Sequence, residues 1–123
     1  MIFELSGETP SKKNSRINTR SGRSFPNKRY TMWHDKAIQE LYLLRQANKI
    51  APLSEDKRIS ITFTFFHGDL KRRDSDNQCS SVLDTLIDAG IIPDDSWKVI
   101  PRKIIIDEYD KGNPHCIIEI QEL

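Results

Sequence analysis

The stretch Asp74–Gly90, which reads DSDNQCSSVLDTLIDAG, carries the strongest secondary-structure signal in this chain of 123 residues. Its apolar residues recur at intervals of three and four, which places them on one face of a helix. These residues are Cys79, Val82, Leu83, Leu86 and Ile87. Asp76 stands at the position of a helix N-cap, and Gly90 stands where a glycine commonly ends a helix. The stretch therefore predicts an amphipathic helix whose first residues are acidic.

The segments on both sides of this helix predict an α+β fold. Residues 30–48 repeat apolar residues at helical spacing, which predicts a first helix. Strands are expected at 1–5, 59–65, 97–106 and 116–120. Pro101 interrupts the third of these strands, which favours an edge or a bulge. The order β-α-β-α-β-β predicts a single two-layer domain over residues 1–123, with a mixed sheet packed by two helices.

The composition is typical of a small soluble protein with a modest core: 37% of the residues are hydrophobic and 30% are charged. Such a core favours a homodimer that buries more surface. No apolar run is long enough to span a membrane, and the first residues lack the pattern of a signal peptide. Cys79 and Cys116 are isolated within periodic segments, so we expect reduced core thiols in a cytoplasmic protein.

Positive charge is concentrated near the amino end, although the net charge is only +1. Residues 12–29, KKNSRINTRSGRSFPNKR, contain no acidic residue. Their cations are Lys12, Lys13, Arg16, Arg20, Arg23, Lys28 and Arg29. The segment lacks apolar periodicity, so we expect a long basic loop over about residues 6–29. It is either a solvated linker or a segment that grips nucleic-acid phosphates.

A second charge cluster stands at the start of the predicted helix. KRRDSDNQ, at 71–78, places three cations directly before two aspartates. One aspartate could cap the helix while the other is solvated. Alternatively, Asp74 and Asp76 point to the same side of an extended segment and hold a divalent cation. Aspartates that hold a metal, beside cations that hold phosphates, are what a metal-dependent nuclease needs.

A further acidic pair, Asp94–Asp95, lies just beyond the helix. Four helical turns would carry it about 20 Å from the first pair. It can join that pair only if the turn after the helix folds back, or if a second subunit brings its own copy. Asp84 lies two turns beyond Asp76 on the same face, which makes it a candidate for supporting the site.

The segment 71–99, KRRDSDNQCSSVLDTLIDAGIIPDDSWKV, resembles the signature region of the RusA-type Holliday junction resolvases. In that pattern a basic run precedes D-x-D-N, a helix follows, and an Asp-Asp pair closes the segment. The resemblance implies a homodimeric endodeoxyribonuclease that cuts four-way DNA junctions symmetrically with Mg²⁺, or with Mn²⁺ as an alternative ion. Such enzymes are commonly encoded by phages and prophages, so the expected location is the cytoplasm of a bacterial or phage-infected cell.

The resemblance also assigns roles to individual residues. The family's catalytic, metal-binding aspartates correspond to Asp74, Asp76 and Asp95. Asp94 is an additional candidate ligand, and Asn77 is expected to orient Asp76 or the first helical turn. We expect DNA contacts from the basic segment 12–29 and from Lys71, Arg72 and Arg73.

One position departs from the family pattern, which continues D-x-D-N-x-x-Lys, because the place of the lysine holds Ser80. A serine cannot supply positive charge to a reacting phosphate. Either another cation takes over, or cleavage is slow or absent; the candidate cations are Lys71, Arg73 and Lys98. The alternative function is therefore a non-catalytic or weakly catalytic protein that binds junctions or other branched DNA. A small interaction protein without a nucleic-acid partner would leave both charge clusters unexplained.

Overall fold

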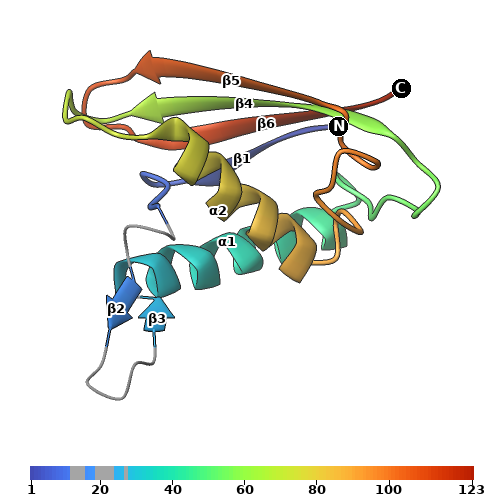
Figure 1. Ribbon diagram of the computed structural model, residues 1–123, viewed down its shortest axis with the longest axis horizontal. Coiled ribbons are helices and arrows are strands. Elements are labelled where there is room, and N and C mark those ends of the chain that lie inside the picture. The colour runs from blue at the N-terminus through green and yellow to red at the C-terminus, as the bar shows by residue number, and fades with distance from the viewer. Residues whose placement is uncertain (12–15, 19–23, 27) are drawn as a thin grey trace.

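The computed structural model describes residues 1–11, 16–18, 24–26 and 28–123, which form two layers (Figure 1). One layer is a four-stranded sheet of β1 (Ile2–Ser6), β4 (Ile59–His67), β5 (Arg102–Tyr109) and β6 (His115–Glu122). The other contains α1 (Lys28–Gln46) and α2 (Ser75–Asp88), which lie on the same side of the sheet. The predicted α+β class and the order of its main elements are confirmed. No helix in these ranges is long and apolar enough to cross a membrane.

The sheet has the order β1-β6-β4-β5, and its strands run in mixed directions. β4 pairs parallel with β5 and antiparallel with β6, and β1 pairs antiparallel with β6. Phe63 in β4 is opposite Ile105 on one side and Ile118 on the other. A parallel pair requires a crossover connection, and α2 provides it between β4 and β5. The mixed sheet therefore follows from the position of α2 in the chain.

The structure corrects the boundaries of the third predicted strand. β5 begins directly after Pro101 and continues beyond Ile106. Proline lacks the N–H group that a sheet requires, so strand pairing begins after it. Residues 96–99 form a turn instead, in which the Val99 N–H donates to Ser96 O at 3.0 Å. The predicted edge position is confirmed, because β5 stands at the end of the strand order.

The segment expected as one loop over about residues 6–29 contains two short strands, so that prediction is wrong in part. β2 (Arg16–Asn18) and β3 (Ser24–Pro26) pair antiparallel, with Ile17 opposite Phe25. Residues with β-branched or aromatic side chains favour strands, which accounts for pairing at this position. Four of the predicted DNA-binding cations lie outside the described residues: Lys12, Lys13, Arg20 and Arg23.

The core lies between the sheet and the two helices. Leu41 of α1, Leu86 of α2 and Phe63 of β4 are all fully buried in one apolar cluster. Cys79 and Cys116 are free and buried in the same cluster, as expected of core thiols. Burial raises the pKa of both thiols, that of Cys79 to about 11. The two cysteines therefore contribute to packing as uncharged groups.

Replacing Phe63 with alanine is expected to lower the free energy of unfolding by about 3–5 kcal/mol, because truncation of the buried ring leaves a cavity. Denaturant unfolding followed by circular dichroism measures the change. Lys111→Ala, in the exposed turn before β6, is the control and is expected to stay within about 0.5 kcal/mol of the wild type. Equal stability of the two variants would contradict the central position of Phe63.

Candidate active site

Helix α2 has Asp74, and not Asp76, as its N-cap. The Asp74 carboxylate accepts hydrogen bonds from the Asp76 N–H at 3.2 Å and from Asn77 Nδ2 at 3.3 Å. The prediction that Asp76 caps the helix is therefore wrong. Both aspartates are chemically suited to capping, and Asp74 takes the role because its backbone is extended, with φ −107° and ψ 101°. The Asn77 side chain contacts the N-cap residue Asp74 through this hydrogen bond.

The two aspartates face different pockets, because Asp76 lies in the first helical turn and not in an extended segment. One pocket, of about 330 Å³, is lined by Asp69 and Asp74 together with four cations, which are Arg29, Lys71, Arg72 and Arg73. We call it the basic pocket. The second pocket, of about 350 Å³, is lined by Asp76, Cys79, Ser80, Leu83, Asp95, Lys103 and Ile105. We call it the acidic pocket, and the start of α2 separates it from the first.

The acidic pocket forms because the chain folds back after α2. Gly90, with φ +73°, adopts the left-handed conformation that ends a helix, as predicted. The Ile91 N–H then donates to Leu86 O at 2.9 Å, and the Ile91 side chain is fully buried. Asp95 therefore reaches the pocket that Asp76 of the same chain lines. Of the two alternatives for bringing these acids together, the folded-back turn is the one observed.

The other predicted acids lie outside this pocket. A hydrogen bond from the Ser96 hydroxyl, aided by backbone N–H groups, holds the pKa of Asp94 below its usual range, so Asp94 caps a turn. Asp84 is half-buried on α2 and is not among the lining residues. In the part of the chain that the structure describes, no three His, Cys, Asp or Glu side chains are grouped closely enough to hold a metal. Of the aspartates that the family pattern assigns to the metal, Asp76 and Asp95 are the two that line one pocket, whereas Asp74 lines the basic pocket with Asp69.

Two carboxylates that line one pocket fit a hard divalent ion. Mg²⁺ commonly takes one or two protein carboxylates and completes its octahedron with water and substrate phosphates. Asp76 and Asp95 supply such a pair. Burial raises the pKa of the neighbouring Cys79 thiol to about 11, so in the absence of a metal it keeps its proton. The carboxylate oxygens of this pair suit a hard divalent ion better than a soft metal that prefers thiolate ligands.

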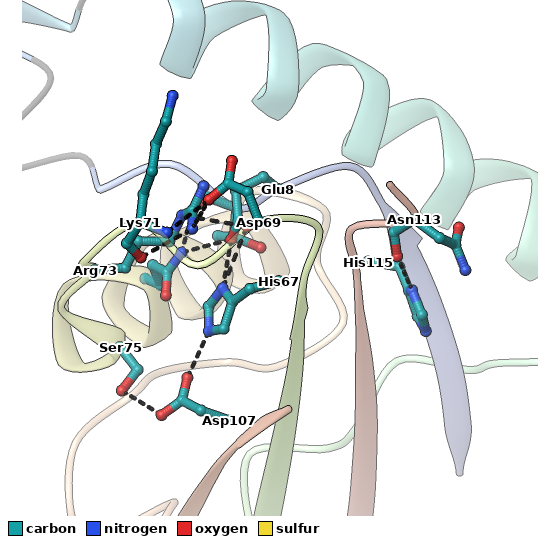
Figure 2. Close-up of polar contacts among 11 residues, drawn as sticks. Glu8, His67, Asp69, Lys71, Arg73, Ser75, Asp107, Asn113 and His115 are labelled. Atoms are coloured by element: carbon teal, nitrogen blue, oxygen red, sulfur yellow. Dashed lines mark hydrogen bonds and ion pairs between the residues drawn. The ribbon is translucent and has the colours of Figure 1, made fainter. Parts of the chain in front are cut away.

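On the other side of the start of α2, the Glu8 carboxylate joins three parts of the chain. It is 12% exposed and pairs with His67 Nδ1 at 3.0 Å and Arg73 Nε at 3.2 Å (Figure 2). It also accepts a hydrogen bond from Gln78 Nε2 at 2.9 Å. Glu8 follows β1, His67 ends β4, and Gln78 lies in α2. These contacts hold the segment 67–75, which carries the basic run, against the helix and the sheet.

The three cations that precede α2 differ in their surroundings. Arg73 is 17% exposed and pairs with two carboxylates, one of which is Asp69 at 2.7 Å. This hydrogen bond lowers the pKa of Asp69 to about 2. Lys71 and Arg72 are exposed, and Lys71 extends away from the Glu8 contacts (Figure 2). Arg29 at the start of α1 joins them in the basic pocket, so two distant parts of the predicted DNA-binding surface meet there.

His67 is clamped between two acids (Figure 2). Its Nδ1 lies 3.0 Å from Glu8 Oε2, and its Nε2 lies 2.8 Å from Asp107 Oδ1. Asp107 in turn accepts a hydrogen bond from the Ser75 hydroxyl at 2.9 Å. Burial lowers the pKa of His67, but the hydrogen bonds with Asp107 and Glu8 outweigh this effect, so the pKa is raised. The imidazolium form donates to both acids and ties β4 to β5 and to the first residue of α2.

The fold and the two pockets define a class of protein: a small α+β domain with a carboxylate pair in a pocket on one side of a helix start and a group of cations in a pocket on the other, which suits a metal-dependent nuclease. Residues 7–121 match the family described as "Endodeoxyribonuclease RusA". A curated "Crossover junction endodeoxyribonuclease RusA" from Aquifex aeolicus (strain VF5) is 30% identical over 110 residues, which is 89% of this chain and 82% of that protein. The chain belongs to the RusA family of endodeoxyribonucleases, hydrolases of DNA phosphodiester bonds. The resemblance noted in the sequence is confirmed.

We expect His67→Gln to reduce stability at low pH and to have little effect at high pH. The pKa of His67 is raised by folding, so its imidazolium contributes stability that is fully present below the unfolded-state pKa of about 6.5. This contribution is lost as the pH rises through the folded-state pKa. Urea unfolding of both proteins at about pH 5.5 and about pH 9 measures the difference. An equal loss at both pH values would contradict the ionic clamp.

Proposed function

We propose that this protein resolves four-way DNA junctions by hydrolysing paired phosphodiester bonds with Mg²⁺, for which Mn²⁺ can substitute. The observation that carries the proposal is that Asp76 and Asp95 line one pocket in a chain of the RusA family. The Aquifex aeolicus relative is named for the crossover junction, and its similarity extends over most of both chains. This similarity supports the same class of substrate for the present chain.

The carboxylates of Asp76 and Asp95 would hold the ion in the acidic pocket. Such an ion polarises a phosphate oxygen and lowers the pKa of a bound water. Asp74 remains a predicted third ligand and catalytic residue, although its side chain lines the basic pocket. Its hydrogen bond with the Asp76 N–H also fixes the helical turn from which Asp76 projects. Asp74 therefore supports the site through the backbone in addition to any contact with the ion.

The basic pocket is suited to the phosphates next to the one that is cut. Arg29, Lys71 and Arg72 line it, and among the described residues no carboxylate lies within 4 Å of their charged nitrogens. Arg73, by contrast, already has two acidic partners, which favours a structural role beside its predicted contact with DNA. Contacts of this kind follow the DNA backbone, so binding is expected to depend on salt and not on sequence.

A homodimer is the assembly that suits paired cuts. A four-way junction with matched arms has approximate two-fold symmetry, and a two-fold dimer presents the same pocket twice. Each chain contains both Asp76 and Asp95 in its own acidic pocket, so each subunit can cut one strand. We propose that the two cuts are made by the two subunits.

A non-catalytic junction-binding protein is the competing function, and Ser80 favours it. The Ser80 hydroxyl donates to Asp76 O at 3.3 Å and brings no charge to the acidic pocket. A protein that only binds DNA, however, gains nothing from two carboxylates in one pocket, because they repel phosphates. The acidic pair therefore favours hydrolysis over binding alone.

Asp76→Asn is expected to reduce Mg²⁺-dependent cleavage of a synthetic four-way junction by about 100-fold or more, because one of two carboxylate ligands is lost. Junction binding without metal is expected to be retained, because the substitution removes a negative charge. Denaturing gels of the cut strands and gel-shift titrations measure the two effects. The wild type is expected to produce symmetric paired nicks.

The matched control is Glu55→Gln, which neutralises an exposed acid in the loop before β4 and should cleave like the wild type. Cleavage by Asp76→Asn at the wild-type rate would contradict the proposed site. Tight binding by the wild type without any cuts would instead establish the competing function.

Lys71→Ala and Arg29→Ala are each expected to weaken junction binding equally for different sequences. Each is also expected to make the negative slope of log K against log salt concentration shallower by about 0.9, because one phosphate contact is lost. Binding titrations at several salt concentrations measure the slope. Lys49→Ala, an exposed cation beyond the end of α1, is the control. A slope that changes as much in the control as in the pocket variants would rule out the basic pocket as the DNA contact.

A further inference from the structure

Lys103, the second residue of β5, lines the acidic pocket with Asp76 and Asp95. Its Nζ lies 3.5 Å from the carbonyl oxygen of Ile100, which is a weak contact. Among the described residues, no carboxylate lies within 4 Å of this ammonium group, in contrast to the doubly paired Arg73. The acidic pocket therefore contains a positive charge that the fold leaves available for a ligand.

The Cys79 thiol lines the same pocket and lies near all three of these charges. Desolvation is the main cause of its raised pKa, and Lys103 acts against the shift while Asp76 and Asp95 add to it. Charges affect a pKa over short distances only, because water and salt screen them. Lys103, Asp76 and Asp95 accordingly line one pocket together with Cys79.

The cations that the sequence offers in place of the family lysine lie outside the acidic pocket. Lys71 lines the basic pocket, and Arg73 is held by two acids. Lys98 is exposed in the turn before β5 and is not among the residues that line the acidic pocket. Among the described residues that line the acidic pocket, Lys103 is the one with a positively charged side chain.

We propose that Lys103 is a catalytic residue that binds a non-bridging oxygen of the phosphate to be cut. The inference rests on the proposed function. In the reaction a water oxygen bonds to phosphorus and gives up a proton to solvent, the bond from phosphorus to the 3′ oxygen breaks, and the 3′ oxygen takes up a proton from solvent. Negative charge builds on the non-bridging oxygens as the new bond forms, and the Lys103 ammonium stabilises it while keeping its own proton.

Ser80 allows the proposal to be tested by moving the charge. It lies one helical turn after Asp76 on α2 and lines the same pocket as Lys103, so side chains from the helix and from β5 meet there. Ser80 is exposed, so a longer side chain at this position has room. A lysine introduced at this position can therefore supply the charge that a Lys103 variant lacks.

The experiment compares the wild type with Lys103→Met, Lys103→Arg and the double variant Lys103→Met with Ser80→Lys. Single-turnover cleavage at saturating junction is expected to fall about 100-fold in Lys103→Met, the loss typical of one charge-stabilising donor. Lys103→Arg and the double variant are each expected to cleave at least tenfold faster than Lys103→Met. Mn²⁺ binding to the free protein, followed by electron paramagnetic resonance, is expected to be at least as tight in Lys103→Met as in the wild type, because the substitution removes a positive charge that repels the ion.

Wild-type cleavage together with a Lys103→Met rate within threefold of it would overturn the inference and leave the proposed function intact. Weaker Mn²⁺ binding or a large loss of thermal stability in Lys103→Met, without recovery in the double variant, would also overturn it, because Lys103 would then be structural. A wild type that binds Mn²⁺ but leaves the junction intact would overturn the proposed function and this inference together.

Discussion

The packing of α2 against the sheet is the contact on which both pockets depend. Val82 and Leu86 are fully buried, and together with the cap at Asp74 they fix the position and the rotation of the helix. Side chains four residues apart share a helical face, which directs Asp76 and Ser80 into one pocket. Side chains two residues apart point in nearly opposite directions, so Asp74 lies on the other side. A hydrophobic contact thus fixes which side chains of the helix start line each pocket.

The contacts of Glu8 are the second structural constraint on the site, because they hold the basic run at residues 71–73 in place. Burying charged groups costs free energy unless they are paired, and Glu8, His67 and Arg73 are little exposed and satisfy one another. Their benefit is therefore a defined geometry more than added stability. The loop that follows β4 is fixed at both ends, so Lys71 and Arg72 project from a held backbone. Positioned cations bind phosphates with a smaller loss of side-chain and backbone entropy than cations on a free loop.

The sequence predicted what depends on local pattern and missed what depends on contacts across the fold. Three features were predictable because each depends on residue spacing within a single element: the apolar stripe of α2, the glycine that ends this helix, and the central strand β4. The N-cap was assigned to Asp76 because two suitable aspartates stand two residues apart, and only the backbone conformation distinguishes them. Lys103 and Glu8 were missed because their partners are distant in sequence and adjacent only once β5 and β1 are in place. Ser80 left open whether another cation replaces the family lysine, and sequence spacing does not reveal that Lys103 lines the pocket of Asp76.

The location of the bound metal tests the central claim most directly. Crystals of the protein soaked in Mn²⁺, with data collected at the manganese absorption edge, show the ion by its anomalous scattering. The account predicts a peak in the acidic pocket, within coordination distance of carboxylate oxygens of Asp76 and Asp95 and on the side of α2 that Lys103 faces. A peak confined to the basic pocket, on Asp69 and Asp74, would contradict it.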